Sequence, residues 1–197
     1  MATPQNVPGF VVGPAARRPG APVLFLDRDG VINVNHGYVH TPDRTEWVPG
    51  ILPLLSNATR LGYQIVVATN QAGIARGLYS VEDFTAYTRW QHEQLQQVGA
   101  PLLGTWFCPH HPQAGLGEFK IDCLCRKPGP GMLLKAIEQF VVDPAQAVFV
   151  GDKISDMQAG AAAGLGKLFL IAGDVGKGDA PQQTVFVPDL AAVQRQL

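Results

Sequence analysis

Short runs of apolar residues alternate along the chain with segments whose apolar positions recur at helical spacing. The continuous runs predict buried strands at 23–26, 65–68, 103–107, 147–150 and 168–171, and a short edge strand at 184–187. The helical spacing predicts helices at 51–61, 80–98, 131–140, 155–163 and near the C-terminus. Ser80 and Asp83 have the spacing of a capping box at the start of the second helix. His92, within the same helix, is expected on the surface.

This alternation predicts an α/β fold, a three-layer Rossmann-like parallel sheet with helices on both faces and no large cap domain. The first 20 residues are rich in Pro, Gly and Ala, and we expect a flexible leader over 1–20 before a single domain over 21–197. A polar, Gly-containing stretch lies within residues 108–125 and is expected to form a loop insertion. In such sheets ligands bind beyond the carboxyl ends of the strands.

Composition narrows the possible partners. Of the 197 residues 46% are hydrophobic and 16% are charged, and the formal net charge is −1. That balance argues against a general nucleic-acid or membrane-surface binder, which needs a basic excess. No apolar run approaches the length of a membrane span, and the N-terminus lacks a signal-peptide core. We therefore expect a cytoplasmic protein, acting as a monomer on a small molecule, with no nucleic-acid or membrane partner.

Carboxylates follow two of the expected strands. Asp27 and Asp29 are two residues apart, so in an extended backbone both side chains point the same way and repel one another. A hard divalent ion such as Mg²⁺ relieves this repulsion. Asp152, after the 147–150 strand, is a candidate third ligand, and Asp156 is a candidate support for that loop. The alternatives are a solvated turn closed by Gly30 and simple helix capping by the second pair.

Two further groups suit a phosphate. Thr69, Asn70 and Gln71 end a strand with a hydroxyl and two amides, which can cradle phosphate oxygens together with main-chain N–H groups. Arg126 and Lys127 are adjacent cations that can neutralise a phosphate, the first as a planar fork and the second as a point charge. Taken alone, each group is better explained without a ligand, the first as a polar turn and the second as an ordinary surface pair.

The cysteines indicate a second metal. Cys108, Cys123 and Cys125 with one histidine suffice for a closed tetrahedral Zn²⁺ site of structural type, and His110 is favoured over His111. Such a site would also fix Arg126 and Lys127, which follow Cys125 directly. Three reduced, unrelated cysteines are the alternative.

Together and in this order, these motifs resemble the haloacid dehalogenase-like superfamily of phosphatases, from residue 23 to about 171. The resemblance implies that Asp27 is the nucleophile and Asp29 the acid/base, and that Thr69 and Lys127 bind the phosphate. It assigns Mg²⁺ to Asp27, Asp29 and Asp152. Val31 is a departure, since the superfamily commonly has Thr there.

Within the superfamily the chain resembles the D-glycero-D-manno-heptose 1,7-bisphosphate 7-phosphatases, enzymes of bacterial heptose-nucleotide and lipopolysaccharide core synthesis. This resemblance rests on the stretches 27–33, 36–38, 69–77, 108–112, 123–132 and 151–160. It implies structural Zn²⁺ on Cys108, His110, Cys123 and Cys125. It also implies substrate contacts from Arg28, Asn35, His36, Gly37, Tyr38, Asn70, Gln71, Arg126 and Lys153, in addition to Thr69 and Lys127.

Three alternatives stay open at this point. A histidinol-phosphate phosphatase would share the catalytic and zinc groups, but Lys153 and the 36–38 loop favour the heptose substrate. A zinc-stapled, non-catalytic phosphosugar-binding protein would have no need of two repelling carboxylates at Asp27 and Asp29. A zinc module that binds nucleic acid is disfavoured by the net charge of −1.

Overall fold

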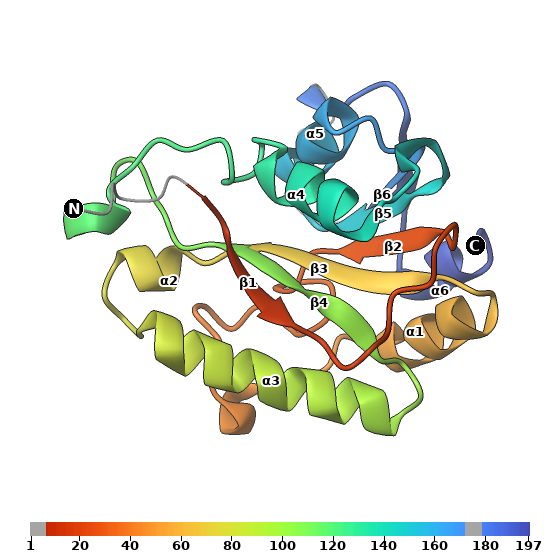
Figure 1. Cartoon of the computed structure of the whole chain (residues 1–197), viewed down its shortest axis with the longest axis horizontal. Coiled ribbons are helices and arrows are strands. Elements are labelled where there is room, and N and C mark those ends of the chain that lie inside the picture. Colours follow the sequence, from red (N-terminus) through yellow and green to blue (C-terminus); the bar gives the residue numbers. More distant parts are fainter. Residues whose placement is uncertain (1–6, 172–178) are drawn as a thin grey trace.

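The fold is built around a central β-sheet (Figure 1). The computed structural model describes residues 7–171 and 179–197. Over these described residues the sheet has seven strands in the order β1-β4-β3-β2-β5-β6-β7. Strand β1 is antiparallel to β4, and the other neighbours are parallel. The strands are β1 (Gly9–Val12), β2 (Val23–Leu26), β3 (Gln64–Asn70), β4 (Leu102–Cys108), β5 (Val148–Gly151), β6 (Lys167–Ile171) and β7 (Thr184–Val187).

Helices cover both faces of this sheet, as the sequence predicts (Figure 1). The α-helices are α1 (Ile51–Arg60), α2 (Ala72–Ala75), α3 (Val81–Gln97), α4 (Gly131–Phe140), α5 (Ile154–Ala162) and α6 (Leu190–Gln194). Short 3-10 helices occupy Pro42–Arg44, Gly117–Phe119 and Pro144–Gln146. Helix α3 begins with the expected capping box between Ser80 and Asp83. Among the described residues, no helix is both long and apolar enough to cross a bilayer.

Strand β2 explains why its sequence is a continuous apolar run. Val23 and Phe25 belong to a core with residues of α4 and α5, whereas Leu24 and Leu26 belong to a core with residues of α1 and α6. Successive side chains of a strand point to opposite faces, so a strand covered on both sides is apolar at every position. The two layers seen above and below the sheet in Figure 1 are therefore both packed against β2.

Two sequence-based expectations are wrong. The sequence predicts a flexible leader over 1–20, but residues 9–12 form β1 and pair with β4, with Phe10 opposite Trp106. The first six residues of that leader lie outside the described part. His92, expected on the surface, is only 4% exposed, and its Nε2 lies 2.8 Å from Oγ1 of Thr105 in β4.

The parallel strands bring the candidate chemistry to one edge of the sheet. Asp27 directly follows β2, Thr69 lies at the end of β3, and Asp152 directly follows β5. Because β3, β2 and β5 are neighbours and parallel, their carboxyl ends lie side by side. The fold therefore gathers residues that are far apart in sequence at the expected place.

Candidate active site

A cavity of about 470 Å³ opens at this edge of the sheet. It is lined by Asp27, Asp29, Asn35, Gly37, Tyr38, Thr69, Asn70, Gln71, Ala72, Tyr79, Arg126, Lys127, Lys153, Ser155 and Asp156. These residues come from segments after β2, β3 and β5, from the 35–38 loop and from the 126–127 segment that precedes α4. The cavity thus unites most of the residues that the sequence singles out.

Three carboxylates lie together at this edge of the sheet. Asp27, Asp152 and Asp156 each offer an oxygen, and these oxygens lie within 4.8 Å of one another. The ammonium group of Lys127 lies 2.9 Å from Oδ1 of Asp27 and 2.6 Å from Oδ1 of Asp156. It also donates to the carbonyl oxygen of Ala68 at 2.8 Å. Lys153 is a second nearby cation, with Nζ 3.8 Å from Oδ1 of Asp152. Two cations therefore face three acids, which leaves the cluster with an excess of negative charge.

Gly30 allows the third carboxylate to approach. Its φ is +94°, and a Cβ at this position would overlap Oδ2 of Asp152. Glycine thus satisfies two demands here, because it tolerates the left-handed backbone and leaves room for the acid. The other carboxylate oxygen of Asp152, Oδ1, is buried and has no hydrogen-bond partner among the described residues.

The carboxylates of this cluster are buried and repel one another, and a bound cation would offset both effects. Burial, and then the nearby charge of Asp27, raise the pKa of Asp152 to about 7. Burial also raises the pKa of Asp27, although Lys127 opposes this shift. Burial lowers the pKa of Lys127, but the charges of Asp156 and Asp27 outweigh burial, so the net shift is upward. Oxygen-only ligands and an unpartnered buried carboxylate oxygen are the donor set that suits Mg²⁺.

The side chain of Asp29 lies apart from this acidic cluster. Its two oxygens accept hydrogen bonds from Nη2 of Arg28 at 2.9 and 2.8 Å, from Nδ2 of Asn33 at 3.0 Å and from Nε2 of Gln71 at 3.2 Å. Burial would raise the pKa of Asp29, but the charge of Arg28 and these hydrogen bonds lower it overall. As a result, the expected contribution of Asp29 to a metal site cannot come from its carboxylate in this arrangement.

The side-chain amides of Asn70, the last residue of β3, and of Gln71, which follows it, line the cavity and also form hydrogen bonds within the site. Nε2 of Gln71 donates to Oγ1 of Thr69 at 2.8 Å as well as to Asp29. Asn70 donates to the main-chain carbonyl of Lys127 and accepts from its N–H, both at 3.0 Å. The polar residues at the end of β3 therefore hold the two segments that carry the candidate acid/base and the candidate phosphate-binding lysine.

Two residues expected to contact substrate do not line the cavity. Arg28 is 1% exposed and turned into the protein, and the alternation of side chains along an extended backbone explains why it points away from Asp27. His36 faces the surface, where its Nε2 lies 2.9 Å from Glu46. The other residues of this loop, Asn35, Gly37 and Tyr38, do line the cavity.

Sequence reasoning missed Tyr79. This residue lies in the turn before α3, lines the cavity, and donates from its hydroxyl to Oε1 of Gln71 at 2.7 Å. Nothing in the local pattern distinguishes it from an ordinary apolar residue near a helix start. Asp156 is more central than the sequence suggests, since it is paired with Lys127 and also accepts from the N–H of Lys153 at 3.0 Å.

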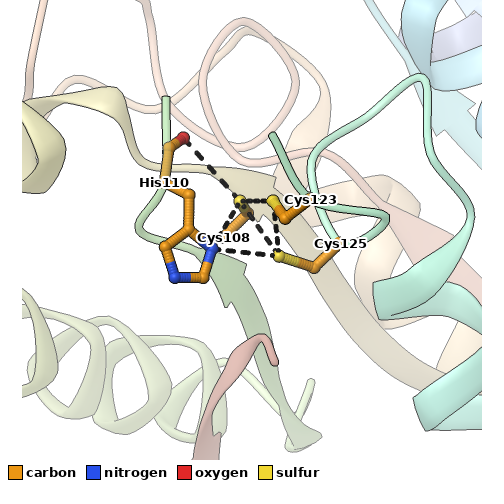
Figure 2. Close-up of side chains that lie close together, drawn as sticks. All are labelled: Cys108, His110, Cys123 and Cys125. Atoms are coloured by element: carbon orange, nitrogen blue, oxygen red, sulfur yellow. Dashed lines mark hydrogen bonds between the residues drawn. The ribbon is translucent and has the colours of Figure 1, made fainter. Parts of the chain in front are cut away.

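The side chains of the cysteine-containing loop form a separate cluster (Figure 2). Cys108, His110, Cys123 and Cys125 each direct one donor atom to a common centre, and these atoms lie within 4.8 Å of one another. The sulfur atom of Cys125 is 3.0 Å from the sulfur of Cys123 and 3.3 Å from the sulfur of Cys108. The same Cys125 sulfur is 3.3 Å from Nδ1 of His110. No disulfide joins these cysteines. The arrangement has the donor set of a closed tetrahedral zinc site.

Thiol protonation in this cluster is uneven. A hydrogen bond with Cys125 lowers the pKa of Cys108 to about 6 despite burial. The hydrogen bond with Cys108, together with burial, raises the pKa of Cys125. Without a cation the thiols therefore cannot all be ionised together, whereas zinc binding requires thiolates. His111 lies outside the cluster, because its Nδ1 accepts from the N–H groups of Gln113 and Ala114.

The cluster is linked to the cavity through Arg126. Its Nη1 donates to the carbonyl oxygen of His110 at 3.2 Å, and the preceding residue is Cys125. Arg126 and Lys127 are thus held between the cysteine cluster on one side and Asn70 on the other.

Comparisons with known proteins agree with this geometry. The haloacid dehalogenase-like hydrolase family matches residues 14–164, and the chain belongs to that family. Individual relatives within this family carry more specific names. A D-glycero-beta-D-manno-heptose-1,7-bisphosphate 7-phosphatase of Yersinia pestis is 45% identical over 150 residues, which cover 76% of this chain and 80% of that protein. The enzyme of the same name from Escherichia coli K12 is 45% identical, with 76% and 78% covered.

A solved structure supports the same relationship. The D,D-heptose 1.7-bisphosphate phosphatase of B. bronchiseptica, complexed with magnesium and phosphate, superimposes with a TM-score of 0.78 at 36% identity. The match covers 89% of this chain and 97% of that one. The expected class, a phosphatase of the haloacid dehalogenase-like family with a Rossmann-like sheet, is confirmed, and Mg²⁺ dependence is typical of this class.

Proposed function

We propose that the protein removes the 7-phosphate of D-glycero-D-manno-heptose 1,7-bisphosphate by phosphoryl transfer to Asp27. The carrying observation is that Lys127 contacts Asp27 at 2.9 Å on the floor of a cavity that Thr69, Gln71 and Arg126 also line. Curated relatives named for this reaction cover most of the chain. They do not favour the histidinol-phosphate alternative, and membership of a hydrolase family does not favour a non-catalytic binder.

The first step uses Asp27 as the nucleophile. Its carboxylate oxygen attacks phosphorus and forms an aspartyl phosphate, while the bond from phosphorus to the sugar oxygen breaks. Asp29 gives a proton to the departing sugar oxygen, which then leaves as an alcohol. For this transfer the Asp29 carboxyl group, which lines the cavity, has to be protonated when the substrate binds.

The second step regenerates the enzyme. Asp29, now a carboxylate, removes a proton from a water molecule that attacks the phosphorus of the aspartyl phosphate. The bond between phosphorus and Asp27 breaks, and inorganic phosphate is released. Through both steps Lys127, Thr69 and main-chain N–H groups stabilise the negative charge on the phosphoryl oxygens.

Asp27 and Asp152 are the residues best placed to hold Mg²⁺, with Asp156 beside them. Asp29, the third expected ligand, is less well placed, because its carboxylate is engaged by Arg28, Asn33 and Gln71. When bound, the ion neutralises the clustered carboxylates and the phosphate, so that an anionic nucleophile can approach an anionic substrate.

Zinc is proposed as a structural ion on Cys108, His110, Cys123 and Cys125. Four protein donors leave no open coordination position, so the ion has no direct part in the reaction. Its role is to fix Arg126, which lines the cavity next to Lys127. That the protein acts as a monomer in the cytoplasm stays a prediction.

Arg126 and the 35–38 loop are proposed to hold the 1-phosphate, which stays on the sugar. The reacting 7-phosphate is on a primary carbon and extends towards Asp27, whereas the 1-phosphate remains nearer the mouth. The planar guanidinium group suits a second phosphate. Lys153, whose side chain is about half exposed, lines the same cavity and adds positive charge.

Phosphate release from purified protein tests the proposal. The value of kcat/KM should be higher for the heptose 1,7-bisphosphate than for histidinol phosphate. Arg126→Ala should lower it for the bisphosphate by about 10-fold to 100-fold, as expected for a lost charged hydrogen bond, and should spare small monophosphates. A clear preference for histidinol phosphate would overturn the substrate assignment.

A further inference from the structure

We propose that Arg28 is a positioning residue for Asp29, and that Tyr79 assists it through Gln71. The inference rests on the proposed role of Asp29 as acid/base, and it replaces the expected contact between Arg28 and substrate. The three residues link the acid/base to the loop that lines the cavity mouth. Gln71 and Tyr79 line the cavity, whereas Arg28 is buried and out of reach of the substrate.

The guanidinium group of Arg28 is placed by two aromatic rings. Its Cζ lies 5.2 Å from the ring centre of Phe84 and 5.3 Å from that of Tyr87, both on α3. Nε and Nη1 have no hydrogen-bond partner among the described residues, so the polar contacts of the group are concentrated on Nη2. A cation buried in this way is held by ring faces on one side and by acceptors on the other.

Nη2 of Arg28 joins two functional segments. It donates to both carboxylate oxygens of Asp29 and, at 2.7 Å, to the carbonyl oxygen of Val39. Val39 is fully buried and follows Asn35, Gly37 and Tyr38, which line the cavity. The position of the loop and the direction of the Asp29 side chain are therefore set by the same atom.

Tyr79 determines which way the Gln71 amide faces. The Tyr79 hydroxyl donates to Oε1 of Gln71 at 2.7 Å, and Nη2 of Arg28 lies 3.3 Å from the same oxygen. With Oε1 occupied by two donors, Nε2 is turned towards Asp29 and Thr69. Burial raises the pKa of Tyr79 to about 12, so its hydroxyl keeps the proton that it donates.

Asp29 is thus held in one direction by three donors, Arg28 and Asn33 from the loop after β2 and Gln71 from the end of β3. A carboxylate that must reach a leaving oxygen loses much of its effect when its direction is lost, because proton transfer depends on the geometry of the donor and acceptor. Arg28, which does not line the cavity, affects the reaction through this direction, and Tyr79 contributes to it through Gln71. Their removal should therefore slow reactions that need the acid more than reactions that do not.

The choice of leaving group provides that comparison. A sugar alkoxide leaves only if it receives a proton, whereas 4-nitrophenolate is a stable anion and leaves without one. The ratio kcat/KM reports the steps up to departure of the leaving group, so it isolates the acid role from the later attack of water. We therefore compare the heptose 1,7-bisphosphate with 4-nitrophenyl phosphate, and use Asp29→Asn as the reference for complete loss of the acid.

In Arg28→Met, kcat/KM for the heptose bisphosphate should fall by roughly 10²-fold or more, and that for 4-nitrophenyl phosphate by less than about 10-fold. Arg28→Lys should recover part of the loss, because it retains the charge without the fork. Tyr79→Phe should also lower kcat/KM more for the heptose bisphosphate than for 4-nitrophenyl phosphate, but by a smaller factor than Arg28→Met. Tyr87→Phe is its matched control, since it removes another buried hydroxyl, one bonded to Thr45, and should affect both substrates alike.

The outcomes separate this inference from the proposed function. If Asp29→Asn is selective for the alkyl leaving group but Arg28→Lys and Tyr79→Phe are not, the positioning role is wrong. If Asp29→Asn itself shows no selectivity, the acid/base assignment is wrong instead. Arg28→Lys and Tyr79→Phe keep the test decisive even where Arg28→Met does not fold.

Discussion

Lys127 and Asp27 form a buried ion pair, with Nζ 2.9 Å from Oδ1 and both side chains nearly inaccessible to solvent. The nucleophile and the cation that binds the phosphate are therefore in place before any substrate arrives. Asp156 completes the arrangement, with its Oδ1 at 2.6 Å from the same ammonium group. Preorganised charge of this kind costs no reorganisation at the moment of reaction.

Asp27→Asn is predicted to abolish turnover, because a neutral amide cannot attack phosphorus. Asp29→Asn should be impaired by roughly 10²- to 10⁴-fold, the usual range for a lost acid/base. Steady-state phosphate release measures both, and melting curves verify that the variants fold. Near-full activity in a folded Asp27→Asn protein would refute the nucleophile assignment.

Activity is predicted to require Mg²⁺ and to be inhibited by Ca²⁺. The acidic cluster of Asp27, Asp152 and Asp156 suits a small hard ion, whereas Ca²⁺ takes more ligands at longer distances and would misplace the nucleophile. Phosphate release is measured after chelation and after stepwise return of each ion. Full activity with only zinc present would contradict the prediction.

Purified protein is predicted to contain about one zinc per chain, as expected for a single closed site. Cys123→Ser should lose the ion, lower the melting temperature and reduce activity indirectly through Arg126. Leu124→Ser is the control, because Leu124 lies between two cysteines but its side chain is 77% exposed. Elemental analysis and melting curves decide the matter. A zinc-free wild type, or a Cys123→Ser protein that melts like the control, would count against the site.

His92 is predicted to make the fold less stable as the pH falls. Burial lowers its pKa from 6.5 to about 4, so the folded state stays neutral where the unfolded chain already binds a proton. Stability is therefore lost as the pH falls below 6.5 and approaches 4. His92→Gln should lack this contribution, worth roughly 1 kcal/mol between about pH 7.5 and about pH 5.5.

Urea unfolding of both proteins at these two pH values measures the difference. Groups common to wild type and variant cancel when the two pH effects are subtracted. An identical pH dependence in the two proteins would show that His92 is not buried in its neutral form.

The elements that the sequence predicts well are those with a strong local signal. Strand β2 is apolar at every position because both its faces are covered, and Ser80 with Asp83 marks the start of α3 at the right residue. The cysteine cluster was also predictable, since few other arrangements use three thiols and a histidine in one short loop. In each case the deciding chemistry lies within a few neighbouring residues.

The features that the sequence does not predict depend on contacts between residues far apart in the chain. Strand β1 lies among Pro and Gly residues and is stabilised by pairing with β4, where the rings of Phe10 and Trp106 are 4.7 Å apart. Tyr79 gains its role only because the fold brings Gln71 to its hydroxyl. Arg28 is different, because the expected substrate contact is wrong and the alternation along an extended backbone, which places Asp27 and Asp29 on one side, could have predicted that Arg28 points to the other.

Phosphorus NMR of the reaction product tests the central claim most directly. The heptose 1,7-bisphosphate is incubated with wild-type protein and Mg²⁺, and the remaining sugar phosphate is identified by its chemical shift and its coupling to the sugar protons. We predict loss of the signal of the phosphate on the primary carbon, release of inorganic phosphate and retention of the anomeric 1-phosphate. Loss of the anomeric phosphate, or no reaction under these conditions, would contradict the account.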